Sequence, residues 1–256
     1  MDSKRYFVLI LVGFLLILPL LNTGCKKGED DPFFSIYTRN SRLTGEWTVS
    51  SYWSEIKYFS TESDTATLTT TEINNTEDWE QLKRIIDSDW EKQLRGEVFR
   101  YRINFAKTGR MTSYYNYQYV DEEGDEDADE ITIKTVNVKE EITGTWNFLG
   151  GADDYKYKER LAIIIEDIKT VTTTSTLKLT DIDDEDAIPD IDFKQEVQQY
   201  KFANGEMSTI YSIRMLKKKE MILEQDINAF EIIRNPDYSS SVESHEGSMT
   251  MTLVKE

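Results

Sequence analysis

Glu97-Val-Phe-Arg-Tyr-Arg-Ile-Asn-Phe105 alternates large apolar side chains with polar ones over its whole length. This period of two predicts a β-strand with one buried face, because successive side chains of a strand point to opposite sides. Phe99, Tyr101, Ile103 and Phe105 are expected to share the buried face. Residues 97–105 are therefore predicted to form a strand at the edge of an apolar core.

The residues that follow continue the pattern. Ala106-Lys-Thr-Gly109 predicts a turn, and Arg110–Val120 predicts the returning strand, on which Tyr115, Tyr117 and Tyr119 share one face. Asn204-Gly205 is a second strong hairpin signal. Further strands with alternating or β-branched residues are expected at residues 131–139, 160–165, 170–180, 193–202, 208–215, 220–225 and 248–254.

These strands predict an all-β protein. The chain is rich in Thr, Tyr, Val and Ile, has only four Pro, and is long enough for one large domain. Closing an antiparallel sheet on itself removes exposed strand edges, and the available length fits about 8–10 strands. An antiparallel β-barrel of about 8–10 strands over residues 42–256 is therefore the expected fold.

One segment near residues 76–95 predicts a helical insertion. Asn75 is a candidate N-cap, and Gly96 is a candidate stop. Apolar residues recur between them at spacings of three and four: Trp79, Leu82, Ile86, Trp90 and Leu94. That spacing gives one apolar stripe on a helix, which is expected to pack on the barrel.

The N-terminus has the layout of a bacterial export signal. Lys4 and Arg5 precede an apolar run at residues 6–21, and a small residue precedes Cys25, which is the only cysteine. At 16 residues this run is short for a membrane span, which needs about 20. Residues 1–24 are therefore predicted to be a signal peptide. Cys25 is predicted to be the lipid attachment site, and residues 25–41 a solvated tether.

Two Thr-Gly-x-Trp motifs carry a family resemblance. Arg42-Leu-Thr-Gly-Glu-Trp47, Ile142-Thr-Gly-Thr-Trp-Asn-Phe-Leu-Gly-Gly151 and Leu216-Lys-Lys-Lys-Glu-Met-Ile-Leu-Glu224 resemble segments of the lipocalin-like lipoproteins of Bacteroidota. The resemblance implies a lipocalin-like β-barrel over residues 42–256, in which the Gly-x-Trp strand closes one end. It also implies a location at the outer membrane. It implies hardly any mechanism. The repeat also fits a duplication of two small domains, although the segments after the two motifs differ.

Two shorter resemblances concern export and modification. Glu29-Asp-Asp31 resembles the signal that sends some Bacteroidota lipoproteins to the cell surface, and it also fits a solvated linker. Asp64-Thr-Ala66 resembles an O-glycosylation acceptor of exported Bacteroidota proteins, in a match of only three residues.

Charge and residue types limit the function classes. A net charge of −18 opposes nucleic-acid binding. The only histidine, His245, lies in a polar stretch and is expected on a surface loop without a catalytic partner. No nucleophile motif such as Gly-x-Ser-x-Gly is present, so no catalytic residue and no cofactor is predicted, and the protein is expected not to be an enzyme.

Two kinds of binding site are weighed. Tyr101, Tyr117, Trp47 and Phe105 are candidates for the lining of a pocket inside the barrel, although aromatic residues at strand period more often fill a core. The acidic stretches at residues 121–130 and 181–192 offer oxygen ligands for calcium, but neither matches an EF-hand loop. Solvated hairpin tips are the simpler interpretation of these stretches, and no metal site is predicted.

The expected role is a lipid-anchored binding or structural module at the outer membrane, on either its periplasmic or its cell-surface side. Its expected partners are the membrane through Cys25 and either a small hydrophobic ligand or a surface protein. A hydrolase with a carboxylate pair in the barrel mouth is an alternative, as is an inhibitor or immunity-type surface protein.

Overall fold

The computed structural model describes residues 30–31, 37–60, 65–74, 80–86, 91–123, 130–151, 158–180, 190–203, 205–234 and 240–255. The signal segment and Cys25 lie outside these residues. The elements are α2 (Arg39–Leu43), β1 (Gly45–Ser60), β2 (Thr65–Asn74), β3 (Glu80–Ile86), β4 (Glu91–Phe105), β5 (Arg110–Glu123), β6 (Glu130–Phe148), β7 (Arg160–Thr180), β8 (Asp190–Lys201), β9 (Met207–Leu216), β10 (Glu220–Arg234) and β11 (Ser240–Val254). The expected all-β class is confirmed. Among the described residues, no helix has the length and apolarity needed to cross a membrane.

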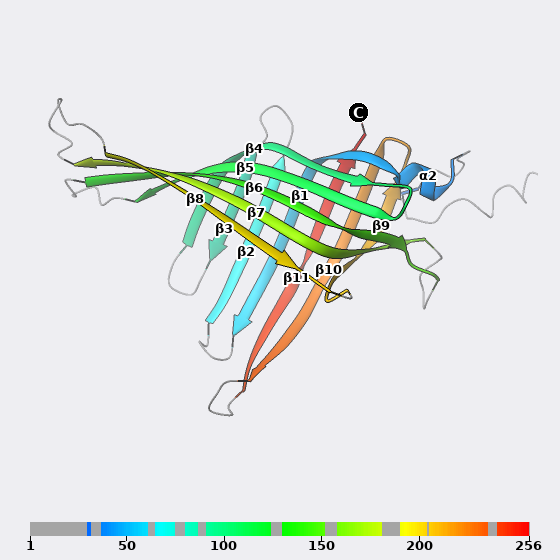
Figure 1. Ribbon diagram of the computed structural model, residues 1–256. Helices are drawn as coiled ribbons and strands as arrows, with labels where there is room; N and C mark the ends of the chain where they lie inside the picture. Colours follow the sequence, from blue (N-terminus) through cyan, green and yellow to red (C-terminus); the bar gives the residue numbers. More distant parts are fainter. Residues whose placement is uncertain are drawn as a thin grey trace, which may run out of the picture.

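Eight strands form a closed antiparallel barrel at the end of the molecule that carries α2 (Figure 1). The ring runs β1-β11-β10-β9-β7-β6-β5-β4 and returns to β1. Closure depends on a short pairing of Gly45–Thr48 with Arg102–Phe105. The Gly-x-Trp segment therefore closes the barrel, as the resemblance implies.

Beyond this closed end the barrel opens. β2 and β3 lie between the distal parts of β1 and β4, and β8 takes the edge of β7 beyond β9. In Figure 1, β5, β6 and β7 run to the left, whereas β10 and β11 run downward, so the two arms diverge. Among the described residues, β8 and the distal part of β10 pair on one side only. The structure is thus a barrel at one end and an open, strongly bent sheet at the other.

The apolar core fills the closed end. Trp47 and Phe105 have no exposed surface, and Trp146 belongs to the same cluster. Both Thr-Gly-x-Trp motifs therefore contribute to one core, which rules out two separate small domains. The buried residues of this cluster are Leu43, Trp47, Val49, Ile103, Phe105, Met111, Trp146, Phe148, Leu161, Ile163, Ile213, Leu216, Met221, Leu223, Met249, Met251 and Leu253.

The predicted turns are confirmed where the structure describes them. Gly109 has φ +83°, a conformation that only glycine adopts without strain, and its N–H donates to the carbonyl of Ala106. Gly205 likewise has φ +79°. The N–H of Lys217 donates to the carbonyl of Glu220 and closes the turn between β9 and β10.

The predicted helix at residues 76–95 is wrong, because the described parts of this segment are strands. Glu80–Ile86 forms β3, and β4 already begins at Glu91. A helix would leave the distal edges of β1 and β4 without hydrogen-bond partners, whereas two added strands satisfy them. Gly96 is not a helix stop: it pairs with Tyr119, and a Cβ at this position would lie 2.4 Å from the carbonyl oxygen of Gln118.

The predicted inward-facing side chains of β4 are confirmed except for Phe99. Tyr101, Ile103 and Phe105 point inward as expected, but the side chain of Phe99 is 47% exposed. The pairing of β4 with β5 shifts register between Val98 and Arg100, so Phe99 lies in a β-bulge. One extra residue reverses the alternation, and Val98 takes the inward position.

The packed body begins earlier in the chain than expected. Residues 25–41 were expected to form a solvated tether, but Asp31 is buried and Arg39 begins a helix. Thr38 caps this helix by accepting a hydrogen bond from the N–H of Ser41. Part of the expected tether therefore belongs to the folded body.

Candidate functional site

A row of tyrosines lines the inner face of β5 where the closed barrel begins to open. The ring of Tyr115 lies 4.6 Å from that of Tyr101 on β4 and 4.7 Å from that of Tyr117. Tyr119 continues the stack at 6.2 Å from Tyr117. Alternate residues of one strand face one side, so the sequence pattern produces this row directly. Tyr52, Tyr101, Tyr115, Tyr117, Tyr119 and Tyr211 are called the tyrosine cluster below.

Tyr52 of β1 and Tyr211 of β9 complete the cluster from other strands. Both pack against the apolar core, as Tyr101 does, and both contribute to the electrostatic environment of the Tyr101 hydroxyl. All six side chains are half-buried. The tyrosine cluster therefore forms the layer between the filled core and the open sheet.

Glu140 of β6 is the acidic group of this layer. It lies directly opposite Tyr115 in the β5–β6 pairing, and its side chain is half-buried. Val138 and Val136 follow it along β6, opposite Tyr117 and Tyr119. The next strand, β7, adds threonines at the paired positions: Thr170, Thr172 and Thr174. The inner face thus changes from phenol rings through apolar side chains to aliphatic hydroxyls.

Burial shifts the pKa values of several groups in this layer. Burial raises the pKa of Tyr117 and of Tyr211 to about 12, with smaller contributions from Tyr119 and Tyr52 respectively. Burial also raises the pKa of Tyr101 and Tyr115. The pKa of Glu140 is raised for the same reason, since burial disfavours the carboxylate. Burial therefore favours the neutral forms of these four tyrosines and of Glu140.

The structure separates the four pocket residues expected from sequence. Trp47 and Phe105 are fully buried in the core of the closed end and line no accessible site. Tyr101 and Tyr117 do come together in the tyrosine cluster. Glu140 is not among the residues predicted from the sequence, and its pairing with Tyr115 across β5 and β6 is what identifies it. The sequence analysis also missed Tyr52 and Tyr211, which only the barrel closure brings close.

The remaining predicted features lie elsewhere. His245 is exposed as expected, but it lies within β11 instead of a loop, and its ring packs edge-on against Tyr58 at 5.1 Å. Residues 124–129 and 181–189, the centres of the two acidic stretches, lie outside the described residues, as does Asp64. Within the described ranges, no three His, Cys, Asp or Glu side chains gather as a metal site would require.

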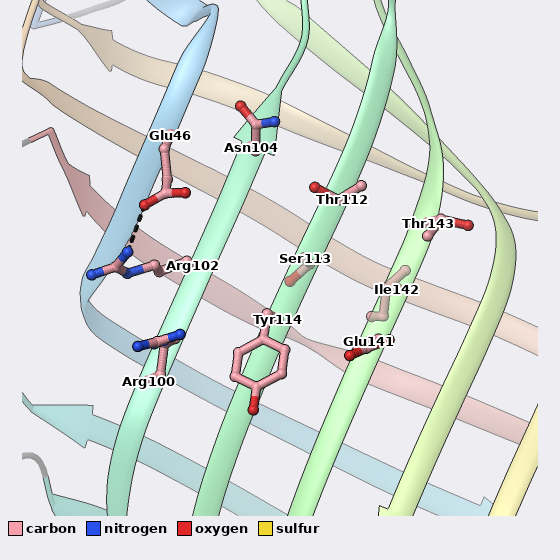
Figure 2. Close-up of a pocket in the computed structure, with 10 residues that line it drawn as sticks. All are labelled: Glu46, Arg100, Arg102, Asn104, Thr112, Ser113, Tyr114, Glu141, Ile142 and Thr143. Atoms are coloured by element: carbon pink, nitrogen blue, oxygen red, sulfur yellow. Dashed lines mark hydrogen bonds and ion pairs between the residues drawn. The ribbon is translucent and has the colours of Figure 1, made fainter.

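A shallow hollow of about 310 Å³ lies on the outer face of the closed end (Figure 2). Arg100 and Arg102 of β4 line it together with Tyr114 of β5. Arg102 forms an ion pair of 2.7 Å with Glu46, and the guanidinium of Arg100 lies 5.8 Å from the centre of the Tyr114 ring. Glu46 and Arg100 are exposed and Arg102 is partly exposed, and ion pairs in such positions contribute little to stability.

Two acids line this outer hollow, Glu46 on β1 and Glu141 on β6 (Figure 2). The registers place three strand steps and two residues between them, which is about 16 Å between backbone positions. Carboxyl pairs of glycoside hydrolases lie about 5–10 Å apart. Glu46 is also paired with Arg102.

Comparisons of this chain with protein-family models, with curated proteins and with solved structures found no match. The choice of a candidate site therefore rests on the geometry of this structure alone. Of the two surfaces described, the tyrosine cluster is the one that combines aromatic area, partial burial and a shifted acid.

Glu140 gives a prediction for the pH dependence of stability. Its folded-state pKa is raised, so its contribution to stability is present below the ordinary value of about 4.3 and is lost as pH rises through the folded-state pKa. Glu140→Gln stays neutral at every pH. We expect this variant to have a higher midpoint of thermal unfolding than the wild type at pH 7.5, and the two midpoints to converge towards pH 4.

The matched control is Glu141→Gln. Glu141 is the next residue of β6, carries the same charge and faces the exposed outer side. Because the whole chain is acidic, removing any carboxylate reduces self-repulsion. An equal rise in the midpoint for Glu141→Gln would show that overall charge, and not the burial of Glu140, causes the effect.

Proposed function

We propose that this chain is an outer-membrane lipoprotein, anchored through Cys25, whose barrel body binds a flat, uncharged and largely apolar small molecule on the tyrosine cluster. The observation that carries the binding role is the stacked row Tyr101, Tyr115 and Tyr117 at the opening of an otherwise filled barrel. Aromatic faces bind flat apolar groups at low conformational cost. The raised pKa values of the site and the acidity of the chain favour a ligand without negative charge.

The residues next to the row give the site a polar side. Phenol hydroxyls and the threonines of β7 can donate and accept hydrogen bonds, and Glu140 in its neutral form can donate one. A few convergent polar groups beside apolar area are typical of small-molecule sites. We infer a ligand with one apolar face and a small number of hydroxyl or carbonyl groups.

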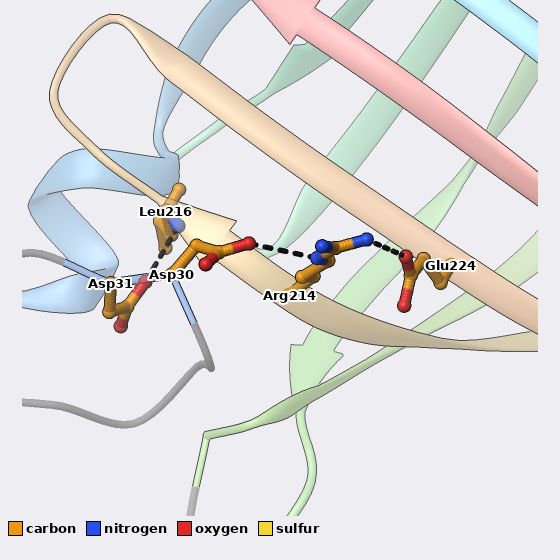
Figure 3. Close-up of polar contacts among 5 residues, drawn as sticks. All are labelled: Asp30, Asp31, Arg214, Leu216 and Glu224. Carbon is orange, nitrogen blue, oxygen red and sulfur yellow. Dashed lines mark hydrogen bonds and ion pairs between the residues drawn. The ribbon is translucent and has the colours of Figure 1, made fainter.

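The contacts that hold the N-terminal segment to the barrel support a defined orientation on the membrane. Figure 3 shows Asp30 beside Arg214 and Asp31 beside Leu216. The N–H of Asp30 donates to the carbonyl of Arg214, and Arg214 Nε lies 2.8 Å from a carboxylate oxygen of Asp30. Asp31 accepts a hydrogen bond of 2.7 Å from the N–H of Leu216. The chain is thus held against the last residues of β9, at the closed end of the barrel.

This attachment limits the distance between the barrel and the lipid. Asp30 lies five residue steps after Cys25, and a fully extended chain of that length spans at most about 18 Å. The 16 residues of β1 alone extend about 53 Å from the closed end. A lipidated Cys25 therefore places the closed end towards the membrane and the tyrosine cluster on the side that opens away from it.

One experiment tests both parts of the proposal. Cys25→Ser is expected to move the protein from the membrane fraction to the soluble fraction. The released protein is then titrated with N-phenyl-1-naphthylamine, an uncharged apolar dye whose fluorescence rises on binding. We expect saturable binding that Tyr117→Ala weakens about tenfold, which corresponds to the loss of one aromatic contact.

Tyr114→Ala is the matched control for the dye titration. Tyr114 lies on the same strand but faces the outer hollow, so its loss should leave binding unchanged. Equal weakening by both variants, or no saturable binding at all, would contradict the proposed site. Retention of the Cys25→Ser variant in the membrane would contradict the anchor and leave the binding result intact.

A further inference from the structure

β8 is an edge strand with both faces exposed. All twelve residues of β8 are exposed, and among the described residues it pairs only with β7. The side chain of Phe193 is 72% exposed, and Ile191, Val197 and Tyr200 are also more than half exposed. Natural proteins normally protect such edges with charged side chains, proline, bulges or short strands. β8 carries five charged residues, but these alternate in sign at Asp192, Lys194 and Glu196. β8 has no proline, and its pairing with β7 is continuous from Asp190 to Lys201.

The apolar residues of β8 form a strip on one face. Ile191, Phe193 and Val197 all have odd numbers, so they point to the same side of the sheet. On β7, Leu177 lies opposite Ile191 and Val171 lies opposite Val197, which widens the strip by one strand. The strip ends at the open edge.

We propose that β8 pairs in antiparallel orientation with β8 of a second copy of this chain, with the twofold axis at Gln195. Opposite residues of an antiparallel pair point to the same side, so a twofold axis must pass through a residue and not between two residues. An axis at Gln195 pairs residues 190–200 of each copy, which is nearly the whole strand.

This register is self-complementary on both faces. On the apolar face, Phe193 of each copy lies opposite Val197 of the other. On the opposite face, Lys194 forms a 2.5 Å ion pair with Glu196 of its own strand and lies opposite Glu196 of the other copy, so the twofold axis brings two such pairs together. Cross-strand pairs of these kinds stabilise a sheet, whereas like charges directly opposite destabilise it.

Neighbouring registers lack this complementarity. With the axis at Glu196, two glutamates face each other, and with the axis at Lys194, two lysines face each other while Asp192 faces Glu196. The strand itself carries two lysines and three acids, so it is close to neutral although the chain has a net charge of −18. A second copy therefore meets little repulsion at this edge.

Charge reversal in two separate proteins tests the proposal. Lys194→Glu gives a copy with two acids at positions 194 and 196, and Glu196→Lys gives a copy with two bases. By sedimentation velocity, the wild type should form dimers, and each variant alone should associate at least about tenfold more weakly. An equimolar mixture of the two variants should regain the dimer, because opposite charges then face each other at both positions. Circular dichroism checks that each variant keeps the strand content of the wild type.

The mixture separates this register from a general effect of charge. The proposal would be overturned if the wild type stayed monomeric at all concentrations. This includes the case in which β8 binds a different protein and the wild type does not dimerise. Variants that associate as strongly as the wild type, or a mixture that stays monomeric, would also overturn it.

A symmetric disulfide gives a second, independent test. In the Cys25→Ser protein, Gln195→Cys places one thiol of each copy on the axis, where opposite Cα atoms lie about 4.5–5.5 Å apart, within disulfide range. Gln198→Cys is the control, because the two copies of residue 198 would lie six residues apart, about 20 Å. Mild oxidation should cross-link the first variant and not the second, and the reverse result would overturn the register.

Discussion

Trp47→Ala is expected to lower the free energy of unfolding by about 3–5 kcal/mol, because it leaves a cavity in the centre of the closed barrel. Trp47 has no exposed surface, and its indole N–H donates a 2.6 Å hydrogen bond to the carbonyl of Leu43. The Lys255 ammonium lies 4.2 Å from the centre of a Trp47 ring. Burial lowers the pKa of Lys255. The substitution therefore removes packing, a hydrogen bond and a cation–π contact together. Urea unfolding followed by fluorescence measures the loss.

Two other tryptophans serve as controls. Trp53 lies on the same strand but its side chain is 41% exposed, so Trp53→Ala should change the free energy of unfolding by about 0.5 kcal/mol or less. Trp146 is buried in the same core and donates a 3.0 Å hydrogen bond to Ala106, so Trp146→Ala should also be strongly destabilising. Both buried variants should lower one cooperative transition. Two transitions that respond separately would contradict the single core.

Strand faces that depend only on local alternation were predictable from the sequence. Met249, Met251 and Leu253 are buried as their spacing in the last strand suggests, and Tyr115 and Tyr117 stack on the predicted face. Such predictions succeed because a single strand determines which side chains share a side. Phe99 does not follow this rule, because its side chain is exposed where alternation predicts a buried one. Its bulge arises from the pairing with β5, which no property of residues 97–105 alone encodes.

Features that depend on pairing between strands distant in the sequence, such as barrel closure, could not be predicted from local sequence patterns. The segment near residues 80–95 has a helical spacing of apolar residues, but the two strands beside it have open edges that only further strands can satisfy. Tertiary hydrogen bonding overrides local periodicity there. In the same way, Tyr52 and Tyr211 join the tyrosine cluster only because strands far apart in sequence meet in the barrel. Strand alternation thus accounts for four of the six tyrosines, whereas Tyr52, Tyr211 and Glu140 depend on pairing between strands.

Asp31→Asn is expected to destabilise the protein by about 3–5 kcal/mol, because it leaves a buried arginine without its counter-ion. Asp31 forms an ion pair with Arg39, and both side chains are almost completely buried. The carboxylate of Asp31 also accepts the hydrogen bond from the N–H of Leu216, while Arg42 donates to the carbonyl of the same residue. The N-terminal segment thus satisfies both backbone groups at the end of β9, and the substitution weakens this attachment.

Asp30→Asn is the control that distinguishes the effect of breaking the buried Asp31–Arg39 pair from the effect of removing one negative charge. Asp30 is adjacent, carries the same charge and also pairs with an arginine, but the side chains of Asp30 and Arg214 are both nearly half exposed. Exposed pairs contribute about 0–1 kcal/mol, so Asp30→Asn should have a small effect. Urea unfolding of both variants measures the difference. Equal stability of the two would mean that the segment detaches and that water solvates Arg39, in which case the closed end would not hold a fixed orientation towards a lipid on Cys25.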